Sequence, residues 1–485
     1  MSNIGGSSGG GPPSALDEAQ RHAVAQLLRI SPAAAALGEQ FTNAGHDIAL
    51  VGGSVRDALR DDLGNDLDFA TSAHPDETER LVGQIADAVW DIGKEFGTIG
   101  CRFGDLTCEI TTYRSDKYER GTRKPDVSYG DTLEGDLGRR DFTVNAMAVR
   151  LPSQAFVDPF GGLHDLAAAV LRTPGRAEDS FDDDPLRMMR AARFAAQLRF
   201  SVDPAVLNAM TAMSERIAIV SPERVRDELS KLLLTRAPKV GLTLLVESGL
   251  AQHILPELPA LKLEVDEHHH HKDVYEHSLT VLDQAIDLET EGPDLTLRLA
   301  ALLHDIGKPA TRRFEPGGGV SFHHHEMVGA RMTVKRLKAL RFPNELVQDV
   351  ARLVELHLRF HGYAEGEWTD SAVRRYVRDA GPQLRRLHQL TRADCTTRNR
   401  RKAAALSRAY DRLEQRIEEL AAQEELAAIR PDLDGNEIMQ ILDVPPGRVV
   451  GEAYAYLLEL RLDRGPMAKG EVAEELRRWW AKRGR

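Results

Sequence analysis

The chain has 485 residues, of which 42% are hydrophobic and 28% are charged, and its formal net charge at pH 7 is −12. This length suits three or four domains of roughly 100–200 residues each. The acidic balance excludes a protein that coats nucleic acid by charge alone, although a local basic face remains compatible with it. The three cysteines, Cys101, Cys108 and Cys395, are too few for a disulfide framework and favour a reducing cytosol.

In chain order, the pattern changes from mixed to helical. Short β-prone runs such as "DIALV", "DLDFAT", "TIGCRF", "LTCEITTY" and "NAMAVRL" occur before residue 176, and apolar residues recur at helical spacing after it. No uninterrupted apolar run is long enough to span a bilayer. The pattern therefore predicts an α+β head followed by an all-α body. The predicted parts are a flexible tail over 1–15, a head over 16–175, a helical neck over 176–262, a further domain over 263–405 and a C-terminal helical region over 406–485.

The first stretch that carries chemistry is "LVGGSVRDALRDDLGNDLDFA" at 50–70. An apolar strand enters a Gly-Gly turn, a short helix follows, and a second strand carries Asp66 and Asp68. Because side chains two apart on a strand point to the same face, the two carboxylates repel each other unless a positive group lies between them.

A third carboxylate is expected beside this pair. "LTCEITTYR" alternates as a half-buried strand and would place Glu109 on a neighbouring strand. Three hard oxygen ligands would hold two Mg²⁺ ions about 4 Å apart, as in two-metal phosphoryl transfer. The turn at Gly52 and Gly53 would let backbone N–H groups approach phosphate oxygens, and Arg56 would add a charge-assisted contact.

Each part alone is weak, since a DxD pair or a Gly-Gly turn is common, but their order is specific. "GGSVRD", "DLDF", "EITTYR" and "RRDFTVNA" follow one another within one α+β unit. This order resembles the class II tRNA nucleotidyltransferases and bacterial poly(A) polymerases of the polymerase-β-like superfamily. The resemblance implies that Asp66 and Asp68 bind the catalytic metals. It also implies that Arg139 or Arg140 contacts the nucleotide phosphates, that Asp141 contacts the ribose, and that Asn145 belongs to the same nucleotide site.

The stretch "DDDPLRMMRAARF" at 182–194 is similar to the nucleotide-selecting motif of that family. Asp184 and Arg187 are three apart, which predicts one shared helix face. A carboxylate accepts from the amino groups of cytosine and adenine, and a guanidinium donates to their ring acceptors, whereas uracil and guanine leave both groups unpaired. An exposed ion pair is the alternative. Arg190 and Arg193 continue this face toward the phosphates. "PERVRDE" at 222–228 is similar to the following motif of the family, and its Glu223, Arg224 and Glu228 are expected to brace the neck.

A second cluster lies in "LRLAALLHDIGKPATRRF" at 297–314, where His304 and Asp305 are adjacent at the end of an apolar helix. A lone histidine on such a helix is usually a core residue, but a His-Asp doublet with partners before and after resembles the HD metal-dependent phosphohydrolases. The resemblance implies a first metal site of His277, His304, Asp305 and Asp394, which His325 and His357 would extend to two metals. Mixed imidazole and carboxylate ligands suit Mn²⁺, Ni²⁺, Co²⁺ or Zn²⁺ better than Mg²⁺.

The leading hypothesis is template-independent addition of CMP and AMP, from CTP and ATP, to the 3′ end of tRNA, with a possible phosphohydrolase activity in the HD domain. The nearest alternative is a poly(A) polymerase. The run "DIGKEFGTIGCRF" is similar to the form found in the tRNA enzymes, whereas the poly(A) group carries a more basic and bulkier run at this place. Two further alternatives are an HD phosphohydrolase with a non-catalytic RNA-binding head and a tRNA scaffold without catalysis. The expected partners are the tRNA 3′ end, CTP and ATP, with no membrane, and the oligomeric state is left open.

Overall fold

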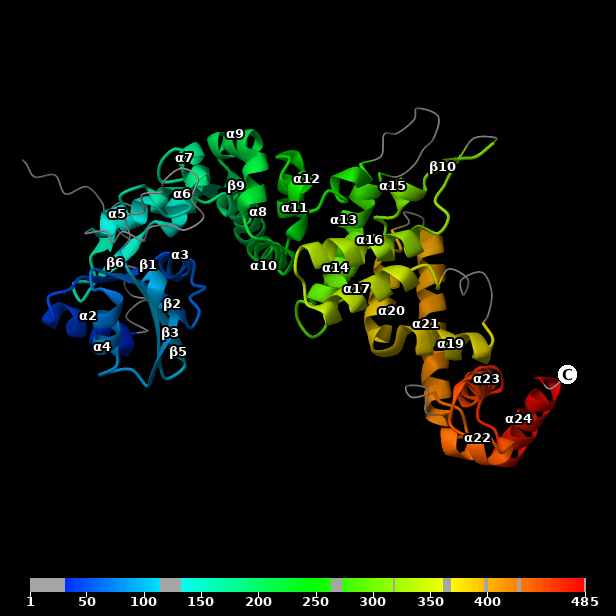
Figure 1. Ribbon diagram of the computed structural model, residues 1–485. Coiled ribbons are helices and arrows are strands. Elements are labelled where there is room, and N and C mark those ends of the chain that lie inside the picture. The colour runs from blue at the N-terminus through cyan, green and yellow to red at the C-terminus, as the bar shows by residue number, and fades with distance from the viewer. Residues whose placement is uncertain are drawn as a thin grey trace, which may run out of the picture. The chain divides into compact units, whose positions relative to one another are not determined.

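The computed structural model describes residues 31–113, 132–262, 273–316, 319–360, 368–396, 400–424 and 429–483 (Figure 1). The chain divides into two compact units, Met1–Ile254 and Leu255–Arg485, and each is described by itself. The predicted tail over 1–15 lies outside the described residues. Among the described residues, no helix is long and apolar enough to cross a membrane.

A seven-stranded mixed sheet forms the centre of the first unit, with the strand order β3-β4-β5-β2-β1-β6-β7. β2 and β5 are parallel, and the other neighbouring pairs are antiparallel. The strands are β1 (Ile48–Val51), β2 (Asp66–Thr71), β3 (Ala88–Gly93), β4 (Thr98–Phe103), β5 (Leu106–Thr112), β6 (Ala148–Leu151) and β7 (Phe156–Val157). The five β-prone runs that the sequence indicated are all strands here, whereas β3 was not predicted.

The two faces of this sheet have different environments. One face packs its alternate apolar residues, among them Leu67, Phe69 and Ile110, into a core with Leu37 and Phe41 of the helix α2 (Ser31–Asn43). The helix α4 (Pro75–Val82) adds buried apolar residues to the same core. Because side chains alternate along a strand, Asp66 and Asp68 on β2 point to the opposite face.

The other helices of the first unit lie between the strands of the sheet or follow the sheet in the chain. Their bounds are α3 (Gly53–Leu59), η1 (Lys94–Phe96), α5 (Leu133–Gly138), η2 (Thr143–Asn145), α6 (Gly162–Ala168), α7 (Ala177–Asp183), α8 (Leu186–Leu198), α9 (Pro204–Met213), η3 (Ser214–Ile219), α10 (Pro222–Leu233), α11 (Pro238–Glu247) and α12 (Ala251–Ile254), with a small sheet of β8 (Val170–Leu171) and β9 (Ser201–Val202). α8 packs against α10 and α11. Gly241 on α11 permits this close contact, since a Cβ there would lie 2.6 Å from the carbonyl oxygen of Ala192.

The second unit is almost entirely helical, as the sequence predicted. Its elements are η4 (Pro259–Leu261), α13 (Val274–Asp287), α14 (Leu295–Leu303), α15 (Lys308–Thr311), β10 (Arg313–Phe314), β11 (Val320–Ser321), α16 (His325–Ala339), α17 (Asn344–Leu356), α19 (Asp370–Ala380), η5 (Gly381–Gln383), α20 (Leu384–Ala393), α21 (Arg400–Gln423), α22 (Gly435–Leu442), α23 (Arg448–Arg464) and α24 (Lys469–Arg483). α14 is buried along most of its length and contacts α13, α17 and α20. The α+β head followed by a helical body confirms the predicted fold class.

Candidate active site and metal cluster

Three carboxylates gather on the open face of the sheet. Asp68 on β2 lies directly opposite Glu109 on the parallel strand β5, and Asp66 lies two residues before Asp68 on the same face. All three residues lie at the solvent-accessible surface, although the surrounding protein partly desolvates the carboxyl groups of Asp68 and Glu109. The N–H group of Asp68 donates to Ser54 Oγ at 3.0 Å, which ties this part of β2 to α3. The structure therefore brings together the three carboxylates that the sequence singled out.

The pKa values of these carboxylates reflect their crowding. Burial, and then the charges of Asp68 and Asp66, raise the pKa of Glu109. Burial and the charge of Asp66 likewise raise the pKa of Asp68, although nearby Arg140 opposes the shift. Crowded carboxylates bind protons more readily because they lack positive charge, and divalent cations supply that charge with the oxygen coordination they prefer. The donor set therefore fits hard divalent cations.

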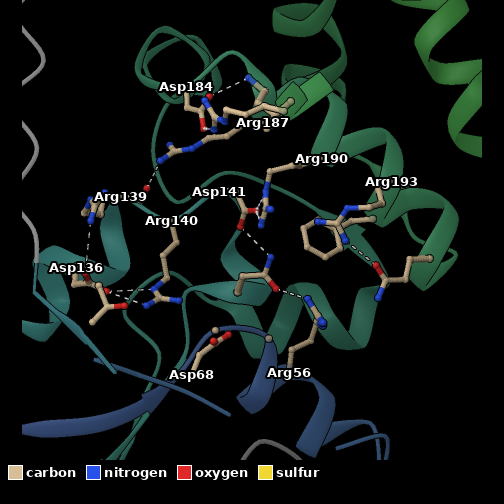
Figure 2. Close-up of a pocket in the computed structure, with 18 residues that line it drawn as sticks. Arg56, Asp68, Asp136, Arg139, Arg140, Asp141, Asp184, Arg187, Arg190 and Arg193 are labelled. Carbon is tan, nitrogen blue, oxygen red and sulfur yellow. Dashed lines mark hydrogen bonds and ion pairs between the residues drawn. The ribbon is translucent and has the colours of Figure 1, made fainter. Parts of the chain in front are cut away.

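A cavity of about 510 Å³ adjoins Asp68 and is rich in arginine (Figure 2). Its lining combines residues from the sheet, the turn before α3, the segment after α5, and helices α8 and α10. The charged residues of the lining are Arg56, Asp68, Asp136, Arg139, Arg140, Asp141, Asp184, Arg187, Arg190, Arg193 and Arg224. Such a concentration of guanidinium groups beside carboxylates suits a polyanionic ligand held with cations.

Arg140 reaches the turn before α3 because Gly52 has no side chain. Gly52 has φ of 70°, and a Cβ at this position would lie 2.6 Å from Arg140 Nη1. Arg140 also donates to Asp136 Oδ2 at 3.0 Å, and Asp136 is buried. Asp136 therefore orients Arg140, and it is a pocket residue that the sequence analysis missed. Its spacing of four residues from Arg140, across the C-terminal end of α5, was the available signal.

A buried network connects the Arg56 and Asn145 that the sequence assigned to the nucleotide site. Arg56 donates to Asn145 Oδ1 at 2.5 Å and pairs with Asp57 at 2.8 Å, so its guanidinium is held within the protein. Asn145 Nδ2 donates to Asp141 Oδ1 at 2.9 Å. Arg190 pairs with the other oxygen of Asp141 at 2.6 Å.

These contacts keep Asp141 ionised. Burial opposes the charge, but Arg190 and the hydrogen bonds from Asn145 and Arg190 outweigh it and lower the pKa of Asp141 to about 2. The carboxylate is therefore an acceptor at neutral pH, fixed between the head and α8.

The expected shared helix face of Asp184 and Arg187 is wrong. α7 ends at Asp183, and Asp184 is extended with φ of −144° and ψ of 101° before α8 begins at Leu186. The physical reason is Pro185, because a residue before proline is pushed out of the helical region. Both side chains nevertheless line the same cavity.

Neighbouring groups hold the Asp184 and Arg187 side chains. Asp184 Oδ2 accepts from Arg224 at 2.7 Å, and Oδ1 accepts from the Leu186 N–H group at 3.1 Å. Arg187 donates to Ser180 Oγ at 2.9 Å and to the Arg139 carbonyl at 2.6 Å. The sequence analysis gave Arg224 a bracing role only, and its contact with Asp184 joins residues 40 apart, which no local spacing indicates.

Arg193 lines the cavity, but its guanidinium is held by protein partners and not directed toward phosphates as the sequence suggested. Its Nε donates to Glu228 on α10, both side chains are buried, and Nη1 donates to Gln197 at 2.8 Å. The guanidinium also lies over the Phe194 ring at 4.0 Å. Arg193 therefore joins α8 to α10, and Glu228 is the brace expected for "PERVRDE".

The second unit gathers the histidines and aspartates of the predicted HD site. His277, His304 and Asp394 have ligand atoms within 4.8 Å of one another, as do Asp305, His325 and His357. Asp305 lies between the two groups. Its Oδ2 is 3.2 Å from His304 Nε2, and its Oδ1 is 3.2 Å from His325 Nε2.

The orientation of the rings favours metal binding. The Nδ1 atoms of His304, His325 and His357 lie 2.7–2.8 Å from backbone carbonyls, so Nδ1 donates to the carbonyl and each ring turns its Nε2 toward the cluster. The Nε2 atoms of His325 and His357 are buried and have no hydrogen-bond partner among the described residues. Unsatisfied buried acceptors of this kind fit divalent metals with imidazole and carboxylate ligands.

The charges of the cluster are strongly coupled. Burial lowers the pKa of His304, but Asp305 outweighs this and raises it to about 9, whereas burial and the charge of His304 lower the pKa of His357 to about 4. Lys308 pairs with Asp305 Oδ2 at 2.6 Å and was not singled out by the sequence analysis. Its place in "HDIGK", three residues after Asp305, was the available signal.

Three family models match the chain. They are the "Poly A polymerase head domain" over residues 48–172, the "Probable RNA and SrmB-binding site of polymerase A" over 199–261, and the "HD domain" over 274–399. These ranges contain the carboxylate face, the helix α10 that carries Glu228, and the His/Asp cluster, respectively.

Among curated proteins, the A-adding tRNA nucleotidyltransferase of Deinococcus radiodurans is 36% identical over 435 residues, which cover 87% of this chain and 92% of that protein. The CCA-adding enzyme of Bacillus subtilis is 40% identical over 212 residues, 44% of this chain and 52% of that enzyme. The match therefore spans about half the length of this CCA-adding relative.

The fold is similar to solved structures over nearly the whole chain. The Bacillus stearothermophilus CCA-adding enzyme in complex with CTP has a TM-score of 0.66 and 23% identity, with 96% of this chain and 98% of that chain covered. The Thermotoga maritima CCA-adding enzyme complexed with tRNA has a TM-score of 0.57 and 18% identity, with 93% and 96% covered.

Proposed function

This chain belongs to the tRNA nucleotidyltransferase and poly(A) polymerase family, and from that premise we propose that it adds CMP and AMP to the 3′ end of tRNA without a template. The observation that carries the proposal is the placement of Asp184 and Arg187 in one cavity with Asp68. In this proposal, the pair reads the base, and Asp68 belongs to the carboxylates that serve phosphoryl transfer.

The reaction joins the RNA 3′-hydroxyl oxygen to the α-phosphorus of the nucleoside triphosphate and breaks the bond to the pyrophosphate, which leaves. Asp66, Asp68 and Glu109 would hold two Mg²⁺ ions, which when bound activate the hydroxyl and neutralise the leaving group. Arg139 and Arg140 would contact the phosphates, since both line the cavity and Asp136 orients them. Asp141 would accept from the ribose hydroxyl, as its pKa keeps it ionised.

Base selection would come from Asp184 and Arg187. Cytosine N4 and adenine N6 donate where Asp184 accepts, and the adjacent ring nitrogen accepts where Arg187 donates. Uracil and guanine would leave a carbonyl against the carboxylate and an N–H against the guanidinium. Each unpaired group costs about 1–3 kcal/mol.

Addition of AMP alone is the second candidate, and the identity to the A-adding tRNA nucleotidyltransferase over most of both chains favours it. Such an enzyme would accept tRNA that already ends in CC. The same cavity serves both reactions, since Asp184 and Arg187 suit adenine as well as cytosine.

The deciding experiment supplies purified protein with three tRNA transcripts, which end before CCA, after C and after CC, together with labelled CTP or ATP. Addition of two CMP and then one AMP to the shortest transcript supports CCA addition. Incorporation of AMP only, and only after CC, supports the second candidate. Long AMP tails on any RNA would show a poly(A) polymerase, and no incorporation with any transcript would contradict both proposals.

For the second unit we propose a site for one or two transition-metal ions, with Asp305 shared between them. His277, His304 and Asp394 would hold one ion, and His325 and His357 the other. Among Mn²⁺, Ni²⁺, Co²⁺ and Zn²⁺, the ligand set suits each better than Mg²⁺. When bound, such ions supply a Lewis acid and an activated water for hydrolysis of a phosphoester at an RNA end, such as a 2′,3′-cyclic phosphate.

A further inference from the structure

An exposed apolar patch lies at the edge of the head sheet. Trp90 and Ile92 on β3 and Phe96 on η1 are 37%, 45% and 47% exposed, although large apolar side chains are usually covered. We call these three residues the β3 patch. The proposed transfer reaction assigns it no role.

Trp90 of the β3 patch lies on the sheet face that carries the carboxylates. Trp90 pairs with Gly100 on β4, Gly100 pairs with Glu109 on β5, and Glu109 pairs with Asp68 on β2. Residues that are paired across neighbouring strands point to the same side of a sheet. One row across four strands therefore runs from the catalytic carboxylates to the Trp90 ring.

Gly100 leaves space for this ring. A Cβ at Gly100 would lie 2.5 Å from Trp90 Nε1 and 2.6 Å from Ile92 Cδ1. The Trp90 and Ile92 side chains therefore lie over β4, toward the carboxylates, instead of pointing away from the sheet edge. The arrangement forms a flat apolar surface beside the reaction centre.

The adjacent row of the same face supplies a positive charge. Arg102 on β4 pairs with Thr107 on β5, and Thr107 pairs with Asp66 on β2. Arg102 is exposed and lies two residues from Gly100, on the same side of the strand. An aromatic surface beside a cation is the arrangement that binds single-stranded nucleic acid, by base stacking and phosphate contact.

The position of the patch favours the acceptor RNA over the incoming nucleotide. The cavity that holds the base-reading pair extends from Asp68 toward the turn before α3 and toward α8, and no residue of β3 or β4 lines it. The 3′-hydroxyl must approach the carboxylates from outside this cavity. Two strand spacings separate β5 from β3, which places Trp90 about 10 Å from Glu109, within reach of a nucleotide near the RNA 3′ end.

We propose that the acceptor strand of the RNA crosses β4 and β3, with a base close to its 3′ end stacked on Trp90 and a phosphate near Arg102. This inference rests on the proposed transfer function. It makes Trp90 a substrate-binding residue that acts on RNA affinity and not on the choice of nucleotide.

The test compares steady-state transfer by the unmodified chain, Trp90→Ala and Trp90→Phe, with tRNA lacking CCA as the acceptor. Loss of one stacked base predicts a KM for tRNA about ten-fold higher for Trp90→Ala. The KM for CTP stays within two-fold, and kcat at saturating tRNA changes little. Trp90→Phe restores most of the RNA affinity because it keeps an aromatic face. Phe314→Ala is the matched control, since Phe314 is an aromatic residue 63% exposed in the other unit, and it should leave both constants unchanged.

A second variant separates stacking from charge. Arg102→Gln should weaken tRNA binding and reduce the slope of log affinity against log salt by roughly 0.7–1, the value for one phosphate contact. Trp90→Ala should weaken binding at every salt concentration without changing this slope. Arg102 is exposed, so its replacement leaves the core of the sheet intact.

An unchanged KM for tRNA in Trp90→Ala would overturn the proposal. Sedimentation would compare the two chains. A dimer of the unmodified chain that becomes a monomer in Trp90→Ala would also overturn the proposal and make the patch a subunit interface. Absence of transfer in the unmodified chain would contradict the proposed function instead. In that case, Trp90→Ala would still be compared with the unmodified chain by direct tRNA binding, and equal dissociation constants would reject the patch.

Discussion

The two candidate metal sites of this chain contrast in burial and ligand chemistry. Asp66, Asp68 and Glu109 are oxygen ligands exposed on a sheet face. The HD cluster is mainly imidazole, and His304, Asp305 and His357 are at most 1% exposed. Exposed oxygen ligands bind hard cations that exchange readily, whereas buried imidazole ligands hold softer metals more firmly. We therefore expect metal to enter the head together with its substrate, and metal in the second unit to stay bound when the chain is purified.

The largest expected effect is a loss of nucleotide transfer from a substitution in the head, which tests whether the two sites are independent. Asp68→Asn removes a carboxylate from the transfer site, and we expect kcat for nucleotide addition to fall by about three orders of magnitude or more, because metal-held charge contributes several kcal/mol. The metal content of the HD cluster, measured by mass spectrometry of the purified chain, should not change. Asp62→Asn is the control, since Asp62 is an exposed carboxylate in the loop that precedes β2. A joint loss of transfer and bound metal would mean that the substitution unfolds the chain or that the sites are not independent.

The complementary change is Asp305→Asn in the HD cluster. Asp305 lies between both groups of ligands, so its replacement should remove most of the bound transition metal. Replacing His325 and His357 together should remove one ion and keep the other. Transfer of CMP should stay within two-fold in all these variants at saturating Mg²⁺. A loss of transfer comparable to that of Asp68→Asn would show that the two units share one reaction.

The sequence predicted these two sites to different depths. The same-face placement of Asp66 and Asp68 follows from strand alternation, which is a local property. The register that pairs Asp68 with Glu109 joins residues 41 apart in the chain. The sequence therefore predicted that the two strands are neighbours, but not which residues pair. The Trp90 row needed the register of two further strand pairings, β3 with β4 and β4 with β5, and was not predicted.

Local conformation explains other differences. The extended backbone at Asp184 follows from Pro185 and was readable from the sequence, although helical spacing was given more weight. The backbone carbonyls that orient His304 and His357 belong to the preceding turn of each residue's own helix. The resemblance to the HD phosphohydrolases predicted those histidines as ligands, whereas only the fold shows that their Nε2 atoms converge.

An intermediate effect concerns the frame that supports the head cavity. Glu228→Gln leaves the Arg193 guanidinium buried without a counter-ion, which costs roughly 3 kcal/mol in the free energy of unfolding. Urea unfolding of the chain should show this loss in the transition of the first unit, with the second unit unchanged. Glu223→Gln on the same helix is exposed and should cost less than about 0.5 kcal/mol. Equal stability of the two variants would show that the Arg193–Glu228 pair does not brace α8 against α10.

The smallest expected effect concerns Arg224, which is half exposed and pairs with Asp184 at 2.7 Å. A partly exposed ion pair contributes about 1 kcal/mol or less to stability, so Arg224→Gln should scarcely alter unfolding. It should instead raise the KM for CTP and ATP about three- to five-fold, an order-of-magnitude value for losing one orienting charge-assisted contact.

Arg224→Lys should restore much of this affinity, and Arg226→Gln, whose guanidinium pairs with Asp227 at 2.7 Å, should leave both KM values unchanged. An increase in UTP incorporation by Arg224→Gln would strengthen the argument, because a carboxylate that is free to turn reads a base less strictly. If the variant loses kcat while both KM values stay constant, Arg224 does not act through Asp184. Within the first unit, a change in KM without a change in kcat would separate residues that position the base from the carboxylates that are proposed to bind metal.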